Sequence, residues 1–242
     1  MSLRFFTFDE RPELERRKGP LLEAWPAFMF EDPVAGERWH LLYERFGGFQ
    51  YFLVDEEVDE LVAEVNSLPV RVDLAALPDR GWDEVMTRGT DAVDPPNVVT
   101  ALQVMIAPGR QGQGLSKLCL ETMRANAVDH GFAHLVAPVR PSWKARYPLV
   151  AIDRYVTWTT DEGLPLDPWL RGHVRLGATI VRPCRESMTI RGSVADWESW
   201  TGMAFPETGD YVVAGALEVV SIDREADTGL YVEPNVWVLH RL

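Results

Sequence analysis

A glycine-bearing stretch near the middle of the chain has the composition of a turn that holds an anionic ligand through backbone groups. It reads Val104-Met105-Ile106-Ala107-Pro108-Gly109-Arg110-Gln111-Gly112-Gln113-Gly114-Leu115-Ser116. Glycine lets the backbone approach a ligand closely and turn consecutive N–H groups toward it. An amphipathic segment follows, and the N-terminus of such a helix adds unpaired donors and partial positive charge. The stretch therefore predicts a pyrophosphate cradle that needs no basic side chains.

Two common phosphate-binding patterns do not fit this stretch. The dinucleotide-binding pattern GxGxxG requires a glycine where the chain has Lys117. The P-loop pattern GxxxxGK[ST] requires a lysine directly after Gly114, where the chain has Leu115. An enzyme that uses the turn for a different nucleotide stays open as an alternative.

The stretch resembles the acetyl-CoA-binding motif of the GCN5-related N-acetyltransferases, Q/R-x-x-G-x-G/A. The chain reads Gln111-Gly112-Gln113-Gly114-Leu115-Ser116, in which Ser116 departs from the Gly or Ala of the last position but is also small. The segment Asp167–Ala178 is similar to the late helix of that family, which often ends Tyr-x-x-x-Gly-Phe. Here His173 stands at the tyrosine position and Ala178 at the phenylalanine position. The resemblance extends over roughly residues 12–190.

This resemblance implies an α/β fold with a mixed sheet, in which two central parallel strands splay apart around acetyl-CoA. The implied activity is acyl-CoA-dependent N-acyl transfer, in which a primary amine attacks the acetyl thioester directly. Backbone groups of Val104, Met105 and Ile106 would contact the pantetheine. The pyrophosphate would be held by the amides of Gln111, Gly112, Gln113, Gly114, Leu115 and Ser116. A non-catalytic acetyl-CoA sensor or interaction module of the same fold is the alternative.

Direct transfer needs a route for the ammonium proton and sometimes an acid for the departing thiolate. His173 is our candidate for the acid, because it occupies the family's tyrosine position and histidine titrates near neutral pH. A helix histidine that only packs or caps is the other interpretation. Tyr147 is a second catalytic candidate, and Tyr155 is a rival for the same role. No single base stands out, because Asp55, Glu56 and Glu57 read more simply as a solvated turn.

A basic and aromatic segment, residues 140–148, follows the strand predicted over residues 132–139. It lies at the end of the sheet where ligands of α/β proteins bind. It concentrates positive charge in an acidic chain. We predict that it contacts an acidic group of the acceptor or the phosphates of the donor through Arg140, Ser142, Trp143 and Lys144. An ordinary surface loop, balanced by nearby carboxylates, explains the same residues equally well.

The composition restricts the partners. The chain has 242 residues and a net charge of −13, which argues against nucleic acid and anionic lipid. The two cysteines form no CxxC pair, so we expect reduced thiols and no metal site. No apolar run approaches the roughly 20 residues of a membrane span, and the N-terminus lacks a leader's apolar region. We expect a cytoplasmic, soluble protein with a small-molecule amine acceptor, and a homodimer stays open.

Hydrophobic periodicity predicts the elements that must position these groups. The predicted helices cover residues 12–30 (or two shorter helices around Gly19-Pro20), 35–46, 114–129, 169–176 and 194–201. The predicted strands cover residues 49–54, 60–72, 98–106, 132–139, a start at 178–181, 211–222 and 230–239. We interpret residues 73–97 as a surface excursion with a short helix near residues 82–86. The chain is expected to form one enlarged domain of residues 1–242, with a core over about 12–190 and a C-terminal extension over about 191–242.

Overall fold

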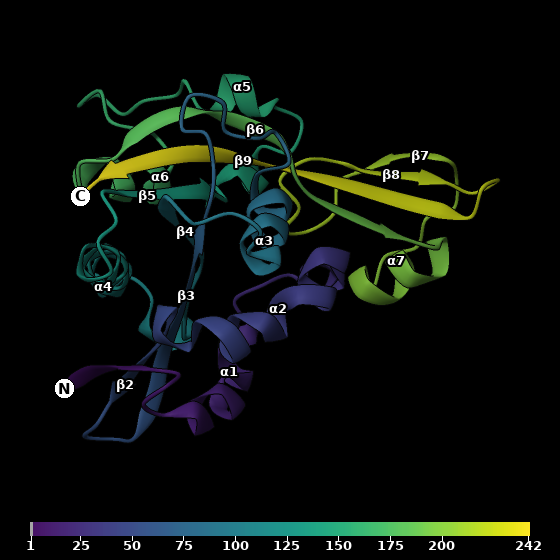
Figure 1. Cartoon of the computed structure of the whole chain (residues 1–242). Coiled ribbons are helices and arrows are strands. Elements are labelled where there is room, and N and C mark those ends of the chain that lie inside the picture. The colour runs from purple at the N-terminus through teal and green to yellow at the C-terminus, as the bar shows by residue number, and fades with distance from the viewer. Residues whose placement is uncertain (1) are drawn as a thin grey trace.

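Nine strands form one mixed sheet in the computed structural model, which describes residues 2–242 (Figure 1). Their order across the sheet is β1-β2-β3-β4-β5-β9-β8-β7, and β6 also pairs with β9. The strands are β1 (Leu3–Thr7), β2 (Gln50–Asp55), β3 (Glu60–Val70), β4 (Val98–Ile106), β5 (His134–Val139), β6 (Thr179–Gly192), β7 (Gly209–Tyr211), β8 (Val220–Asp223) and β9 (Thr228–Arg241).

The parallel pair β4 and β5 separates soon after it begins. The two strands pair only at Val99 with Leu135 and at Thr100 with Val136, although β4 continues to Ile106. The β3–β4 register skips Leu102, and a bulge of this kind bends and twists a strand. Beyond Thr100, the edge of β4 that faces β5 is therefore left without a neighbouring strand. This geometry is the splayed pair of strands that the family resemblance implies.

Seven helices surround the sheet within the described residues: α1 (Gly19–Leu22), α2 (Pro33–Phe46), α3 (Gly81–Asp91), α4 (Leu115–Asp129), α5 (Ile152–Tyr155), α6 (Pro168–Arg175) and α7 (Val194–Thr201). Side-chain caps fix where several of them begin. Asp32 accepts from the Ala35 N–H at the start of α2, and Asp167 caps α6 in the same way. Ser193 and Asp196 form a reciprocal capping box at α7.

Two apolar clusters cover the two faces of the sheet. One cluster gathers side chains of α2, α3 and α7, and the other gathers side chains of α4, α5 and α6. Successive strand residues alternate between them: Val98 packs in the first cluster and Val99 in the second. The two faces thus separate the helix that follows the glycine-bearing turn from helices α2 and α3.

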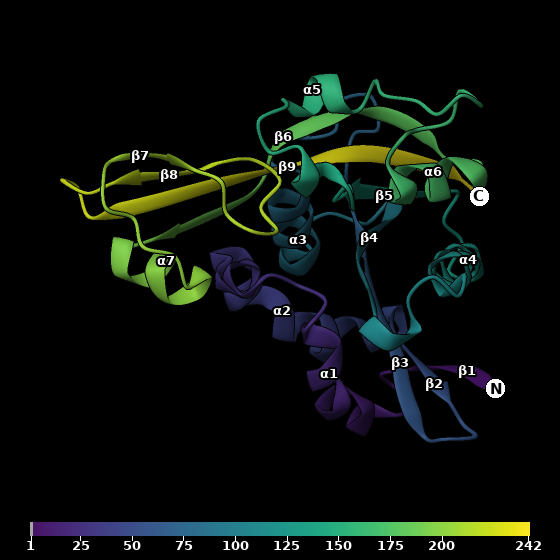
Figure 2. The same cartoon turned by 180° about the vertical axis from the view of Figure 1, so that it is seen from behind.

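The second half of the chain builds an arm on this sheet. Both views show β7, β8 and the outer ends of β6 and β9 extending beyond the other strands, with α7 packed against β6 and β9 (Figures 1 and 2). Trp197 of α7 is fully buried there and contacts Phe28 and Tyr231 through its ring. β9 also runs back between β5 and β8, so the arm and the central strands share one sheet.

The elements around the glycine-bearing turn lie where periodicity predicts them, and several others do not. The prediction of one helix over residues 12–30 is wrong. That segment holds a 3₁₀ turn over Pro12–Arg17, helix α1, and a second 3₁₀ turn over Ala27–Glu31. Pro20 and Pro26 cannot continue a preceding helix, because they lack an N–H group and their rings clash with the previous turn.

The interpretation of residues 73–97 as a surface excursion is also wrong in part. α3 runs over Gly81–Asp91 and buries Trp82, Val85 and Met86 against β6 and α2. Strand β1 was not predicted, and β6 is much longer than its predicted start. The strand predicted over 211–222 is interrupted between β7 and β8, where buried Leu217 donates its N–H to the Tyr231 hydroxyl.

Within the described residues, no helix is both long and apolar enough to cross a bilayer. Cys119 and Cys184 are free and buried in the two different apolar clusters, which places them on opposite faces of the sheet.

Candidate functional site

A cavity of about 1480 Å³ opens where β4 and β5 separate. Its lining includes residues Ala101 to Ile106 of β4, the glycine-bearing turn, part of α6, and side chains of α1 and α2. One cavity therefore connects the start of α4 with the face that α2 covers. A ligand that enters at the turn can reach the α2 side through the gap between the parallel strands.

The glycine-bearing turn has the backbone of an anion cradle. Gly112 and Gly114 have φ of 76° and 78°, the left-handed region that favours glycine. α4 begins directly after Gly114 without a side-chain cap, so its first amides are not occupied by a side chain of the helix start. A Cβ added at either glycine would meet nothing within 4 Å, which shows open space above the turn. These features fit the phosphates of an acyl-CoA.

The predicted donor contacts gather on one wall. Val104, Met105 and Ile106 line the cavity along the free edge of β4, where a chain-like ligand can lie beside the strand. Five of the six predicted turn residues also line it, namely Gln111, Gly112, Gly114, Leu115 and Ser116. Gln113 is exposed in the same turn.

His173 lies on α6 at the cavity wall and is 1% exposed. Its Nδ1 is 2.9 Å from Nε2 of His240, and its own Nε2 has no hydrogen-bond partner within the described part of the chain. Burial, and then the charge of His240, lowers the pKa of His173 to about 3. At neutral pH the ring of His173 is therefore a neutral imidazole and not an imidazolium. Its unpaired Nε2 can form a hydrogen bond with a ligand in the cavity.

Tyr147, the second predicted catalytic residue, does not line the cavity. It is 37% exposed and packs against the rings of Tyr155 and Trp158. Tyr155 donates its hydroxyl to Oδ2 of Asp167, whose other oxygen, Oδ1, caps α6. Asp55, the first residue of the expected acidic turn, is paired instead with Arg110 at 3.3 Å.

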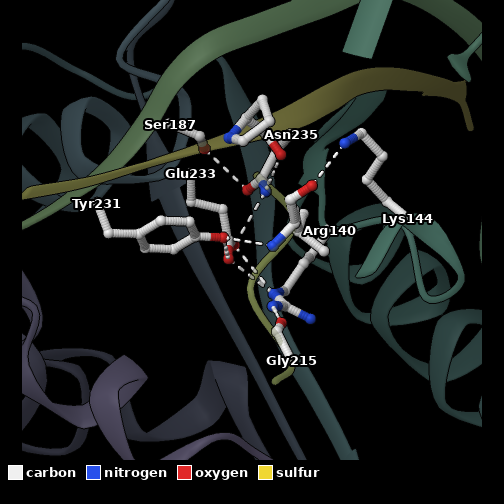
Figure 3. Close-up of polar contacts among 9 residues, drawn as sticks. Arg140, Lys144, Ser187, Gly215, Tyr231, Glu233 and Asn235 are labelled. Carbon is white, nitrogen blue, oxygen red and sulfur yellow. Dashed lines mark hydrogen bonds and ion pairs between the residues drawn. The ribbon is translucent and has the colours of Figure 1, made fainter. Parts of the chain in front are cut away.

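Arg140 follows β5 and is held by its neighbours on the cavity wall (Figure 3). Its Nε donates to both oxygens of Glu233 at 3.0 and 2.9 Å, and its Nη2 donates to the carbonyl of Gly215 at 2.6 Å. Tyr231 donates its hydroxyl to the same carboxylate at 2.9 Å. The positive charge of Arg140 is thus balanced by fully buried Glu233.

The other three residues of the predicted acceptor-binding segment are placed differently from one another. Ser142 and Trp143 line the cavity. Lys144 is fully buried and donates its ammonium to the carbonyls of Leu217 and Tyr147 at 2.5 and 3.2 Å. Burial lowers the pKa of Lys144. The structure therefore brings Ser142 and Trp143 to the cavity, while Lys144 holds the loop that precedes β8.

The structure also brings a polar cluster to the cavity that sequence reasoning missed. Glu64 on β3 is fully buried, and its Oε1 accepts from the Tyr43 hydroxyl and from Asn66 Nδ2. Its Oε2 has no hydrogen-bond partner among residues 2–242. Burial raises the pKa of Glu64, and the positive charge of Lys18 opposes that shift. Glu64 and Asn66 alternate with apolar residues along β3. From the sequence alone, this alternation indicates a face of the sheet that is exposed to solvent, because the helix α2 that covers the face is not yet known.

Comparison with known proteins identifies the family. No family model matches the chain. The arginine N-acetyltransferase avaD of Aspergillus versicolor is 34% identical over 250 residues, which cover 91% of this chain and 86% of that protein. The chain belongs to the GCN5-related N-acetyltransferase superfamily.

Solved structures show the same fold. The loading GNATL domain of CurA from Lyngbya majuscula superposes with a TM-score of 0.63 at 20% identity, covering 99% of this chain and 96% of that one. The GNAT-like decarboxylase GphF, in complex with isobutyryl-CoA, gives a TM-score of 0.58 at 19% identity over 100% and 99% of the two chains. The mixed α/β fold expected for a GCN5-related N-acetyltransferase is thereby confirmed.

Membership of the superfamily indicates which reaction the cavity supports. This GCN5-related N-acetyltransferase is an acyl-CoA-dependent N-acyltransferase, and the turn at Gln111–Ser116 lies where its donor's phosphates fit. Within residues 2–242 there is no group of three or more His, Cys, Asp or Glu side chains arranged to hold a metal ion. The individual assignments of catalytic, donor and acceptor residues stay predictions.

Proposed function

We propose that the protein transfers the acetyl group of acetyl-CoA to a nitrogen atom of a small cationic amine, and that arginine is the first acceptor to test. The continuous cavity that connects the turn at Gln111–Ser116 with the α2 side carries this proposal. Donor and acceptor can approach from opposite faces of the sheet and meet where β4 and β5 separate. The 34% identical relative is named for the acetylation of arginine, which supports the choice of acceptor.

The chemistry is a direct acyl transfer. The lone pair of the acceptor nitrogen attacks the thioester carbonyl carbon, a C–N bond forms, and the C–S bond breaks. CoA leaves as a thiolate that takes up a proton, and the nitrogen loses one. Amides of the turn and of the first turn of α4 orient the donor, while the enclosing helices limit the access of water. Fixed orientation is the main contribution that such a cleft makes to the rate.

Charges on the α2 side of the cavity support a cationic acceptor. Three carboxylates, Glu15, Glu44 and Glu64, line this part together with one ammonium group, that of Lys18. Arg140 adds no free positive charge, because Glu233 balances it. A cationic molecule is therefore favoured there over an anionic one.

A direct assay tests the proposal. Acetyl-CoA is incubated with the protein and arginine, and free CoA thiol and the mass of arginine are followed. We expect thiol release above the acceptor-free rate and a product heavier by one acetyl group. Thiol release that is identical with and without arginine, lysine, agmatine and aromatic amines would contradict the proposed acceptor class.

We also propose that residues 1–242 act as one domain and that the protein works in the cytoplasm without nucleic acid or membrane partners, with a homodimer left open as its assembly. The shared sheet of β5, β9 and β8 supports the single domain. Light scattering after size-exclusion chromatography measures the assembly. A mass near 27.4 kDa would contradict the dimer, and about twice that mass would support it.

A further inference from the structure

The structure places a carboxylate with one unpaired oxygen in the wall of the acceptor side. Glu64 is fully buried and lines the cavity, and its Oε2 has no hydrogen-bond partner within residues 2–242. An ionised carboxylate in such surroundings is unfavourable unless a cation or hydrogen-bond donors balance it. A ligand cation would supply the missing partner.

The nearby cations Lys18 and Arg140 each contact a carboxylate other than Glu64. Lys18 Nζ lies 2.8 Å from Glu15 Oε1 and 3.5 Å from the hydroxyl of Tyr43. Arg140, the other cation near this part of the cavity, is held by Glu233. Lys18 and Arg140 thus each contact another carboxylate directly, whereas Glu64 forms no ion pair within 4 Å among residues 2–242 and interacts with Lys18 only through its longer-range positive charge.

Aromatic rings line the cavity together with Glu64. Trp25, Trp39 and Trp82 are among the lining residues. The rings of Trp39 and Trp82 stack with centroids 6.2 Å apart and an angle of 12° between their planes. Indole faces attract ammonium and guanidinium groups through their negative quadrupole. A carboxylate among tryptophans is a combination that recognises an organic cation.

A chain of hydrogen bonds holds Glu64 in place relative to the donor wall. Gln103 Nε2 of β4 donates to Asn66 Oδ1 at 3.0 Å, and Asn66 Nδ2 donates to Glu64 Oε1 at 3.3 Å. Asn66 Nδ2 also donates to Gln50 Oε1 at 3.1 Å. The free oxygen is therefore positioned by three strands, one of which carries the predicted pantetheine contacts.

We propose that Glu64 determines acceptor specificity by binding a guanidinium or ammonium group of the acceptor through Oε2, while tryptophan rings cover that group. The identity of the bound molecule as acceptor rests on the proposed function. Glu64 acts here as a binding residue for the cation, and no proton transfer is assigned to it.

Calorimetry with CoA present, so that no turnover occurs, tests this proposal. Arginine, lysine and the neutral analogue citrulline are titrated into the wild-type protein and into Glu64→Gln. We expect the wild type to bind arginine or lysine at least about tenfold more tightly than citrulline. The comparison of arginine with lysine shows whether guanidinium or ammonium is preferred. Glu64→Gln keeps the shape of the side chain and should bind all three ligands with similar affinity.

Glu37→Gln is the matched control, because it removes the same charge from an exposed position on α2. It should retain the wild-type preference. Equal affinity of the wild type for arginine, lysine and citrulline would overturn the proposal, and this measurement needs no variant to fold. A Glu64→Gln protein that keeps the preference would overturn it as well.

Kinetics separate this proposal from the function on which it rests. Binding of arginine that depends on Glu64, without acetylation, supports the cation site and contradicts arginine as the acceptor. If arginine is acetylated, Glu64→Gln should raise the KM for arginine and leave the KM for acetyl-CoA unchanged. A loss confined to kcat, with the KM for arginine unchanged, would overturn the proposal in favour of a proton-transfer role.

Discussion

Burial changes the protonation of two cavity residues in ways that depend on what lies beside them. The pKa of His173 is lowered to about 3, so its imidazole stays neutral across the physiological range. The pKa of Glu64 is raised, which leaves its charge sensitive to a bound cation. A neutral histidine on the α6 wall and a buried carboxyl group on the α2 side give the two parts of the cavity different chemical environments.

The first prediction concerns His173→Gln. Because the imidazole is neutral between pH 5 and 9, its loss should leave the pH profile of kcat/KM unchanged in shape. We expect kcat to fall by less than about tenfold, whereas removal of a general acid lowers rates by about a hundredfold or more. The measurement is the pH–rate profile, with His134→Gln at the start of β5 as control. A larger fall together with the loss of one limb of the profile would contradict the prediction.

A second prediction concerns the buried carboxyl pair of Asp32 and Asp83. Burial, followed by the charge of Asp32, raises the pKa of Asp83 to about 8. The folded state therefore holds a proton that the unfolded state releases near pH 4, and the free energy of unfolding should decrease as the pH rises from 4 to 8. Asp83→Asn keeps a donor toward Asp32 and should remove this decrease.

Urea unfolding at several pH values measures this effect. Relative to wild type, Asp83→Asn should gain up to about 4 kcal/mol of unfolding free energy between pH 5 and pH 9, because about three pH units separate pH 5 from the pKa of about 8 and each corresponds to about 1.4 kcal/mol. Asp94→Asn, at an exposed carboxylate, should run parallel to the wild type over the same range. If the free energy of unfolding of Asp83→Asn varied with pH in parallel with that of the wild type, the prediction would be wrong.

At the scale of elements, the turn and the start of α4 line the part of the cavity that is predicted to bind the donor. The backbone of Gly114 has φ of 78°, whereas Gly109 in the same loop has an ordinary φ. Gly114→Ala should therefore raise the KM for acetyl-CoA by about fivefold or more, because a left-handed residue with a Cβ is strained by about 1–2 kcal/mol. Steady-state kinetics measure this KM. Gly109→Ala is the control, because Gly109 has an ordinary φ. Equal KM values for the two variants would count against the cradle.

Sequence periodicity predicted this half of the fold well, since its signals are local. β4 and α4 follow from an apolar β-branched run and a helical apolar face, and a glycine-rich turn separates them. The short turns over residues 12–31 and the buried helix α3 could not be predicted in this way, because their conformation depends on the elements that pack against them. Prolines and charged residues in those segments resemble a surface loop until the packing against β6 is known.

The turn that is predicted to bind the donor could be located from the sequence, whereas the buried cluster around Glu64 could not, for a related reason. The turn at Gln111–Ser116 uses backbone groups, whose arrangement follows from glycine spacing. Glu64 depends on the long-range contact between β3 and α2, because Tyr43 and the helix body cover that face of the sheet. Alternation along β3 indicates which residues share a face, but it does not indicate what lies on that face.

At the scale of the whole molecule, the net charge of −13 attracts cations toward a cavity whose α2 side is lined by Glu15, Glu44 and Glu64. The KM for arginine should rise by about threefold between 10 and 150 mM salt, as the screening length falls from about 30 to 8 Å. The KM for citrulline, measured on the same preparation, should stay constant. An identical salt response for both molecules would refute electrostatic attraction.

The position of β9 gives a prediction about folding. This strand pairs with β5, β6 and β8, so the arm and the central sheet both need it. A chain that stops after Asp227 should lack a cooperative unfolding transition in calorimetry, whereas a chain that lacks only Arg241 and Leu242 should retain one. A cooperative transition in the shorter chain would show that the two halves of the sheet fold independently.

The same strand order has a consequence during synthesis. β5 ends at Val139, whereas its antiparallel partner β9 ends at Arg241. At about 5–20 residues per second, the ribosome needs roughly 5–20 s to make the intervening residues. During that time the edge of β5 that pairs with β9 has no partner strand. A nascent chain paused in this interval presents a short apolar strand to its surroundings. Chaperone binding and aggregation of this protein should therefore concentrate in the time between the emergence of β5 and that of β9.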